Sequence, residues 1–131
     1  MRSQVSPGGG AGEGGIVTVL VVDDDPLVAM TAVDMLEDIG LKTLRAHSGR
    51  QALELLKSSQ PIDLLMTDSA MPGMTGVELA RLARDLLPQL PILLVTGHGE
   101  HANSEATGLP CLGKPYHQAQ LQAAIDNLLR R

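Results

Sequence analysis

Short apolar segments alternate with longer amphipathic segments along most of the chain. Five runs rich in Val, Leu and Ile have the length of buried strands, and they predict strands over 16–22, 41–46, 62–67, 91–95 and 109–113. Apolar residues at helical spacing predict helices from Pro26 to Gly40, from Ser48 to the Ser58–Pro61 stretch, over Thr75–Leu87 and over Tyr116–Leu129. Strands separated by helices require crossover connections, so the pattern predicts an α/β domain with a parallel sheet.

Two segments depart from this alternation. Residues 1–15 contain six of the fourteen glycines and almost no large apolar side chains, so we expect a flexible leader or linker, with the folded domain over 16–131. The stretch Gly97–Gly108 (GHGEHANSEATG) has few apolar residues with which to dock a helix. We therefore expect the helix of the fourth crossover to be truncated or irregular.

Composition narrows the class of protein. With 15 acidic and 10 basic residues the formal net charge is −5, which argues against nonspecific binding to nucleic acid or to an anionic membrane. Phe and Trp are absent and Tyr116 is the single aromatic residue, so the core is aliphatic and base-stacking surfaces are excluded. The single cysteine, Cys111, cannot form an internal disulfide, which is typical of a reducing compartment; with no membrane span or signal peptide in the sequence, we expect a cytoplasmic location.

Polar side chains follow four of the predicted strands. Acids follow the first strand (Asp23, Asp24 and Asp25) and the third (Asp68), Thr96 follows the fourth, and Lys114 follows the fifth. In an open parallel sheet, ligands bind beyond the carboxyl ends of the strands. Adjacent strands lie about 4.8 Å apart, so carboxylates on two of them can share one cation. Oxygen ligands with few carboxylates favour Mg²⁺. Asp25, which precedes Pro26, is better explained as a helix N-cap.

The motifs VLVVDDDP, DLLMTDSAMPGMTGVEL, PILLVTG and KPY, in this order, resemble the receiver domain of two-component response regulators. The resemblance covers about residues 18–129. It implies a doubly wound, flavodoxin-like sheet of five parallel strands in the order 2-1-3-4-5. It also implies that the chain is a signalling domain and not an enzyme acting on an external substrate.

The same resemblance implies a role for each matching residue. Asp68 is the implied phosphoacceptor, and Mg²⁺ is held by the acidic pair Asp23 and Asp24 together with Asp68 and the backbone carbonyl of Ala70. Thr96 is the implied switch hydroxyl and Lys114 its ion-pair partner, followed by Pro115 in a cis bond. An aspartate carboxylate is an established nucleophile toward phosphoryl groups, and the transfer requires mainly positioning and charge neutralisation.

Three features differ from the family pattern. The position three residues before the lysine is commonly aromatic in the family, but here it is Cys111. The rotation of an aromatic ring at this position together with the switch hydroxyl therefore cannot occur in this chain. Thr96 and Lys114 are only eighteen positions apart, which resembles the short receivers of hybrid sensor histidine kinases. Ala70 and His98 occupy variable positions that tune hydrolysis of the acyl phosphate.

Other motifs fit less well. Residues 108–114 spell GxxxxGK, but Pro115 supplies neither the hydroxyl nor the N–H of a nucleotide-binding loop. The glycines of Gly97–Ala102 lack the later acidic residue of a dinucleotide site. His98, His101 and Cys111 match no common zinc spacing.

We therefore expect a phosphorelay receiver that accepts a phosphoryl group on Asp68 from a histidine kinase or histidine phosphotransfer protein and signals by protein contact. Because the sequence stops soon after the last predicted helix, we expect no attached output domain: either a stand-alone regulator or the C-terminal receiver of a hybrid kinase. The alternative is a pseudo-receiver adaptor that acts without phosphorylation.

Overall fold

The computed structural model of the chain describes residues 16–97 and 108–129. The strands are β1 (Thr18–Val22), β2 (Lys42–Ala46), β3 (Leu64–Asp68), β4 (Ile92–Thr96) and β5 (Cys111–Gly113). The helices are α1 (Pro26–Asp38), α2 (Gly49–Lys57), α3 (Gly76–Leu86) and α5 (Gln118–Leu129). The expected leader, the expected irregular fourth helix and His98 and His101 lie outside the described residues.

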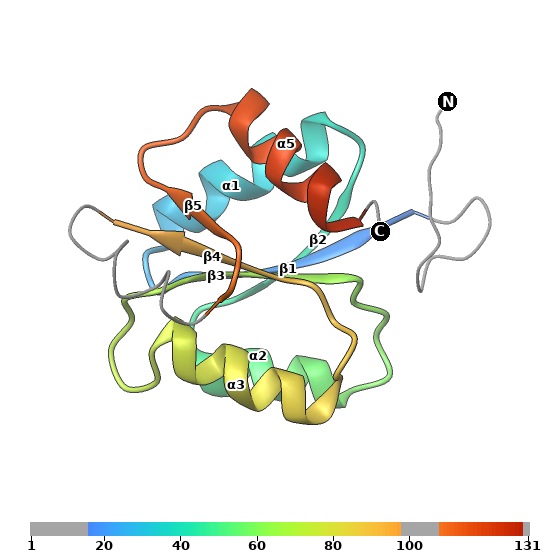
Figure 1. The fold of residues 1–131 in the computed structure, drawn as a ribbon, viewed down its shortest axis with the longest axis vertical. Coiled ribbons are helices and arrows are strands. Elements are labelled where there is room, and N and C mark those ends of the chain that lie inside the picture. Colours follow the sequence, from blue (N-terminus) through green and yellow to red (C-terminus); the bar gives the residue numbers. More distant parts are fainter. Residues whose placement is uncertain (1–15, 98–107, 130–131) are drawn as a thin grey trace.

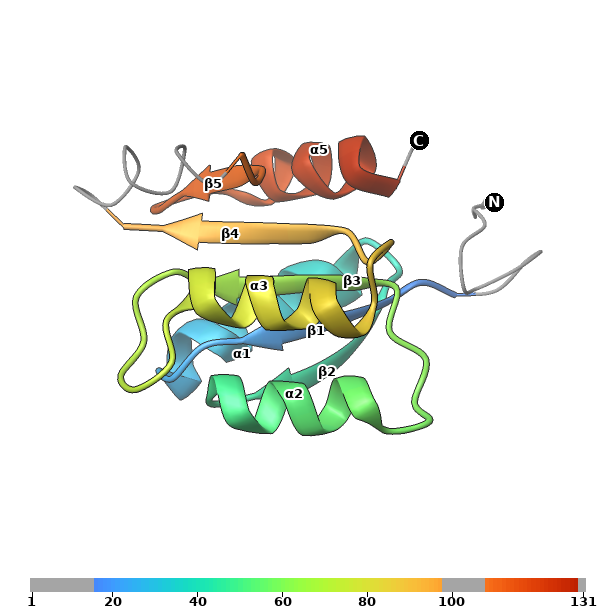
Figure 2. The same cartoon turned by 60° about the horizontal axis from the view of Figure 1, so that its bottom comes forward.

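The five strands form one parallel sheet in the order β2-β1-β3-β4-β5, which confirms the predicted fold class. Helices α1 and α5 cover one face of the sheet, and α2 and α3 cover the other (Figure 1). Figure 2 shows the strands pointing the same way, so that all their carboxyl ends meet at one edge. Any site built from strand ends therefore has to lie at this edge.

Each face of the sheet has its own aliphatic core. Alternating residues of β1 divide between the two cores: Leu20 and Val22 face α2 and α3, whereas Val19 and Val21 face α1 and α5. All residues of β1, β3 and β4 are buried, because each of these strands has neighbours on both sides and helices on both faces. The less apolar β2 lies at an edge of the sheet, as its sequence predicts.

The helices begin at the residues that the sequence marks as caps. The carboxylate of Asp25 accepts from the N–H of Leu27 at 2.9 Å, and Pro26 occupies the first helical position of α1. Ser48 caps α2, and Thr75 forms a capping box with Glu78 at the start of α3. Because Asp25 is engaged as a cap, the acidic run after β1 leaves two residues for other chemistry.

The ends of several elements differ from the prediction by one or two residues. Strands β3 and β4 include Asp68 and Thr96 as their last residues. The ladder between β3 and β4 continues through the bond from the Ser69 N–H to the Val95 carbonyl, and that between β4 and β5 through the bond from the Lys114 N–H to the Thr96 carbonyl. Strand β5 has only three residues, and it follows Pro110, which has no N–H to donate to a ladder. Three of the seven residues that spell GxxxxGK, Cys111–Gly113, therefore belong to a strand, so the segment does not form a phosphate-binding loop between a strand and a helix. None of the helices in the described part is long and apolar enough to cross a membrane.

Candidate functional site

Two buried carboxylates continue the α1/α5-facing side of their strands. Asp23 follows Val19 and Val21 in the alternation of β1, and Asp68 follows Leu64 and Met66 in β3. The two strands are paired directly, with Val22 opposite Thr67. Local chain alternation and strand pairing therefore bring these two acids to one point.

Asp24 completes a cluster of three carboxylates. One oxygen from each of Asp23, Asp24 and Asp68 lies within 4.8 Å of the others. Asp23 and Asp68 are each only 7 % exposed, whereas Asp24 is exposed. Two carboxylates about 5 Å apart repel each other by roughly 3 kcal/mol at an effective dielectric constant of 20. The cluster is therefore a place where a cation binds favourably.

The environment of Asp23 disfavours its negative charge. Burial, and to a lesser extent the neighbouring carboxylate of Asp68, raise the pKa of Asp23 above its usual value of 3.8. A hydrogen bond from the Asp25 N–H to Asp23 Oδ1, at 2.9 Å, acts in the opposite direction but does not cancel the rise. This carboxylate therefore gains from any cation placed beside it.

Lys114 supplies one such cation. Its Nζ lies 3.2 Å from Asp68 Oδ1, and it reaches that carboxylate from the loop that follows β5. The backbone holds the lysine in place, because its N–H donates to the Thr96 carbonyl at 2.8 Å. The peptide bond to Pro115 is cis, as the resemblance implied.

Thr96 and Ala70 occupy the same edge of the sheet. Thr96 is fully buried as the last residue of β4, next to Val95, which pairs with Asp68. Ala70 is exposed two residues beyond Asp68, at the start of the loop between β3 and α3. The structure thus brings Asp23, Asp24, Asp68 and Lys114 into one cluster. Thr96 lies at the end of the neighbouring strand β4, and Ala70 lies just after the end of β3.

Tyr116 is a neighbour of the site that the sequence prediction did not include. Its side chain lines a small cavity together with Asp23, Asp68 and Ala29. Burial, followed by the charges of Asp23 and Asp68, raises the pKa of the Tyr116 hydroxyl above 10.0. The position of Tyr116, two residues after Lys114 at the end of the last strand, was the signal in the sequence that could have identified it.

The donor set fits Mg²⁺. Three carboxylates within mutual reach offer oxygen ligands only, and the exposure of Asp24 leaves room for the waters that Mg²⁺ retains. Cys111, the one sulfur ligand of the zinc alternative in the described part, is half-buried in β5, and its thiol donates to the Leu109 carbonyl at 3.3 Å. The chemistry at this edge of the sheet is therefore that of a hard cation.

Comparison with known proteins agrees with this geometry. The model of the response regulator receiver domain family matches residues 19–126. The response regulator receiver protein CpdR of Brucella abortus is 34 % identical over 115 residues, which cover 85 % of this chain and 95 % of CpdR. The phosphate regulon transcriptional regulatory protein PhoB of Pseudomonas aeruginosa is 37 % identical over 121 residues, 87 % of this chain and 52 % of PhoB. This chain thus spans about half the length of that transcriptional regulator.

Solved structures lead to the same family. A response regulator receiver domain protein from Clostridium thermocellum superposes with a TM-score of 0.82 at 28 % identity, covering 88 % of this chain and 96 % of that one. A response regulator receiver protein from Sinorhizobium medicae superposes with a TM-score of 0.79 at 34 % identity, covering 88 % and 95 % of the two chains. The strand order, the acidic cluster with its lysine and these similarities support one conclusion: the chain belongs to the response regulator receiver domain family of two-component signalling.

Proposed function

We propose that the chain is a phosphorelay receiver whose phosphoacceptor is Asp68. The donor is a phosphorylated histidine of a histidine kinase or histidine phosphotransfer protein, and the reaction takes place in the cytoplasm. One observation carries the proposal: three carboxylates lie within 4.8 Å of one another, and Lys114 Nζ lies 3.2 Å from one of them. A fold that gathers acids in this way requires a cation, and phosphoryl transfer makes use of one.

In the proposed step, a carboxylate oxygen of Asp68 attacks the phosphorus of the phosphohistidine. The new oxygen–phosphorus bond forms as the phosphorus–nitrogen bond to the imidazole breaks, and the electron pair of that bond returns to the ring nitrogen. Asp68 suits the role of nucleophile because it is fixed at the end of a buried strand. Lys114 neutralises negative charge that develops on the phosphoryl oxygens.

Asp23, Asp24 and Asp68 would hold the Mg²⁺ ion, with the backbone carbonyl of Ala70 as a further ligand. When bound, the ion supplies charge neutralisation to the transferred phosphoryl group. The raised pKa of Asp23 supports this assignment, because a buried carboxylate beside two others gains most from a divalent cation. Removal of the cation is therefore expected to prevent phosphorylation.

Phosphorylation would then change the polar contacts at the edge of the sheet. An acyl phosphate carries about two negative charges where the Asp68 carboxylate carries one, so negative charge increases next to Lys114 and near the end of β4, where Thr96 supplies a hydroxyl. We propose that Thr96 turns toward the phosphoryl group, that Lys114 pairs with it, and that the altered surface binds a protein partner. The alternative of an adaptor that acts without phosphorylation gives no account of the three acids and their lysine.

Beryllofluoride, which stands in for the phosphoryl group, tests this assignment by NMR. With Mg²⁺ present, the amide signals of Ala70, Thr96 and Lys114 should shift in ¹⁵N-labelled protein, and EDTA should reverse the change. Asp68→Asn should abolish it, whereas Asp63→Asn, at the opposite end of β3, should not. Shifts that persist in the Asp68→Asn variant would refute the role of Asp68.

A further inference from the structure

A second hollow lies between α2 and α3, the two helices that cover the other face of the sheet from α1 and α5. Its volume is about 640 Å³, and it lies between the first turn of α2, the loop Pro72–Met74 and the side chains of Glu78, Arg81 and Leu82 on α3. Volumes of this size are typical of binding sites. We call it the α2/α3 groove. The proposed phosphotransfer makes no use of it.

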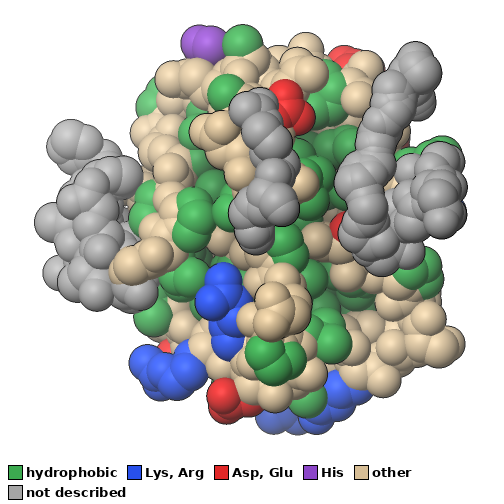
Figure 3. Space-filling view, turned by 45° about the vertical axis from the view of Figure 1, so that its right-hand side comes forward, with side chains coloured by type: hydrophobic (Ala, Val, Ile, Leu, Met, Phe, Trp, Pro, Cys, Tyr) green, Lys and Arg blue, Asp and Glu red, His purple; other side chains and the backbone are tan. Residues whose placement is uncertain are grey.

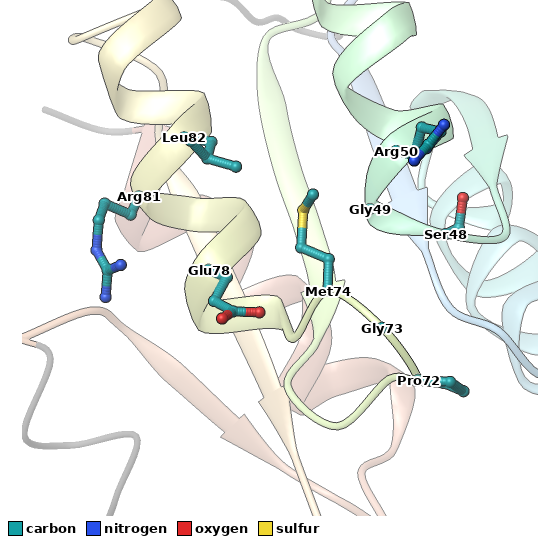
Figure 4. A pocket seen from close by; sticks show the side chains of 9 residues that line it. All are labelled: Ser48, Gly49, Arg50, Pro72, Gly73, Met74, Glu78, Arg81 and Leu82. Atoms are coloured by element: carbon teal, nitrogen blue, oxygen red, sulfur yellow. The ribbon is translucent and has the colours of Figure 1, made fainter.

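The middle of the α2/α3 groove is apolar. Figure 4 shows the side chains of Met74 and Leu82 leaning into the space between the two helices. Gly49 permits this arrangement, because a Cβ atom at that position would lie 2.5 Å from the sulfur of Met74. Met74 therefore packs against the first residue of α2 and contributes apolar surface to the groove.

The apolar surface continues along α3. Leu82 is 40 % exposed and Leu86, one turn further on, is 41 % exposed, so the two share one side of the helix. Leu87 adds a third exposed side chain directly after the helix. Leu82 and Leu86 thus extend the apolar lining of the groove along α3, and an exposed apolar strip beside a groove is a feature of surfaces that bind another molecule.

Cations stand on both sides of this apolar strip. Arg50 extends from the outer side of α2 and Arg81 from the outer side of α3 (Figure 4). Within residues 16–97 and 108–129, neither guanidinium forms an ion pair or a side-chain hydrogen bond. The nearby carboxylate of Glu78 is engaged, since it accepts from the Thr75 N–H at 2.9 Å. Figure 3, which brings the carboxyl-terminal ends of α2 and α3 forward, shows basic side chains together with acidic ones at its lower edge, away from the groove.

We infer that the α2/α3 groove is a docking site for an acidic, leucine-containing peptide segment of another protein. An apolar side chain of that segment lies between the helices on Met74 and Leu82, and its carboxylates pair with Arg50 and Arg81. A small anion would leave the leucines of α3 uncovered. Nucleic acid is disfavoured because the formal net charge is −5 and no aromatic ring lines the groove.

Fluorescence polarisation with the unphosphorylated full chain tests this inference, so the outcome does not depend on the chemistry of Asp68. The probe is a short, fluorescein-labelled amphipathic peptide with leucines on one side and glutamates beside them. We expect saturable binding that the double variant Arg50→Glu/Arg81→Glu weakens at least about tenfold. The matched control Lys42→Glu/Arg45→Glu makes the same charge change at exposed positions of β2, and it should bind within about twofold of the unchanged protein.

Two further measurements separate specific docking from general attraction of charge. Leu82→Ser should weaken binding about tenfold as well, and the peptide should shift the amide signals of Gly49, Gly73 and Arg81 but not that of Asp24. Circular dichroism should show that every variant remains folded, since all the substituted side chains are exposed. The inference is overturned by a lack of saturable binding, by an equal loss in both double variants, by full binding of Leu82→Ser, or by amide shifts confined to α1 and α5.

Discussion

Lys114 and Asp68 form an ion pair across a strand that belongs to neither of them. Their charged atoms lie 3.2 Å apart, although Asp68 ends β3, Lys114 follows β5, and β4 lies between these strands in the sheet. The Asp68 side chain is 8 % exposed and that of Lys114 is 32 % exposed, so the pair is only partly screened by solvent. The lysine therefore offsets part of the repulsion among the three carboxylates.

Loss of this cation should destabilise the folded state when no metal is present. We expect Lys114→Met, which retains the aliphatic stem, to lower the free energy of unfolding by about 1–2 kcal/mol in EDTA, a value discounted for the partial exposure of the pair. Mg²⁺ should reduce this loss, because it restores positive charge beside Asp68. Urea unfolding with and without Mg²⁺ measures both effects. Lys42→Met, on exposed β2, is the control, and an equal change in the two variants would contradict the role of the pair.

Asp23 should make stability fall as the pH rises. Because the folded state raises the pKa of this carboxyl, folding favours its neutral form, and that contribution is lost as the pH rises from about 3.8 through the raised pKa. We expect Asp23→Asn, whose amide oxygen can still accept from the Asp25 N–H, to melt a few degrees above the unchanged protein at neutral pH in EDTA. The difference should shrink toward pH 4. Thermal unfolding across this range checks it, and a variant that melts lower at neutral pH would count against the burial of an unfavourable charge.

Tyr116 should report metal binding directly. It is the only aromatic residue of the chain and lines the same cavity as Asp23 and Asp68, so its fluorescence is expected to change when Mg²⁺ binds and to recover in EDTA. Asp24→Asn should weaken the apparent affinity about tenfold or more, because Mg²⁺ affinity depends on the number of charged ligands. Asp34→Asn, on α1, removes the same charge elsewhere and should bind normally. Unchanged fluorescence at saturating Mg²⁺ would argue against a site in this cluster.

Gly76 should be indispensable for the loop that follows Asp68. A Cβ atom at this position would fall on the backbone carbonyl oxygen of Asp68 and crowd the Cα of Ser69. We expect Gly76→Ala to cost about 2 kcal/mol or more, since the backbone beside the acid has to move. Gly113→Ala is the matched control, because nothing lies within 4 Å of the added atom there. Chemical denaturation compares the free energies of unfolding of the two variants. Equal values would show that the loop after Asp68 can move without loss of stability.

Those parts of the fold that rest on local pattern could be predicted from the sequence. The buried strands, the caps at Asp25, Ser48 and Thr75, and the edge position of β2 follow from short-range residue chemistry and are confirmed. The meeting of Asp23, Asp24 and Asp68 was also predictable, because parallel strands bring their carboxyl ends to one edge. The strand order, by contrast, came from resemblance to a family, since alternation alone does not order the strands.

Features that depend on packing between elements were not predicted. The α2/α3 groove exists because Gly49 and Met74, far apart in the sequence, meet between two helices, and no periodicity encodes that contact. The sequence identifies Tyr116 only as the third residue of the KPY motif, because its burial beside Asp23 depends on how the segment after β5 packs against α1. The last residues of β3 and β4 were missed because the ladder extends one step beyond the apolar runs.

Phosphorylation of Asp68 with the help of a cation is tested most directly by intact-mass spectrometry after incubation of the protein with acetyl phosphate and Mg²⁺. We predict that the protein gains a single phosphoryl group, that Cys111→Ser gains it equally, and that EDTA or Asp68→Asn abolishes the gain. A protein that gains no mass, or one that gains it equally in the Asp68→Asn variant, would contradict the assignment.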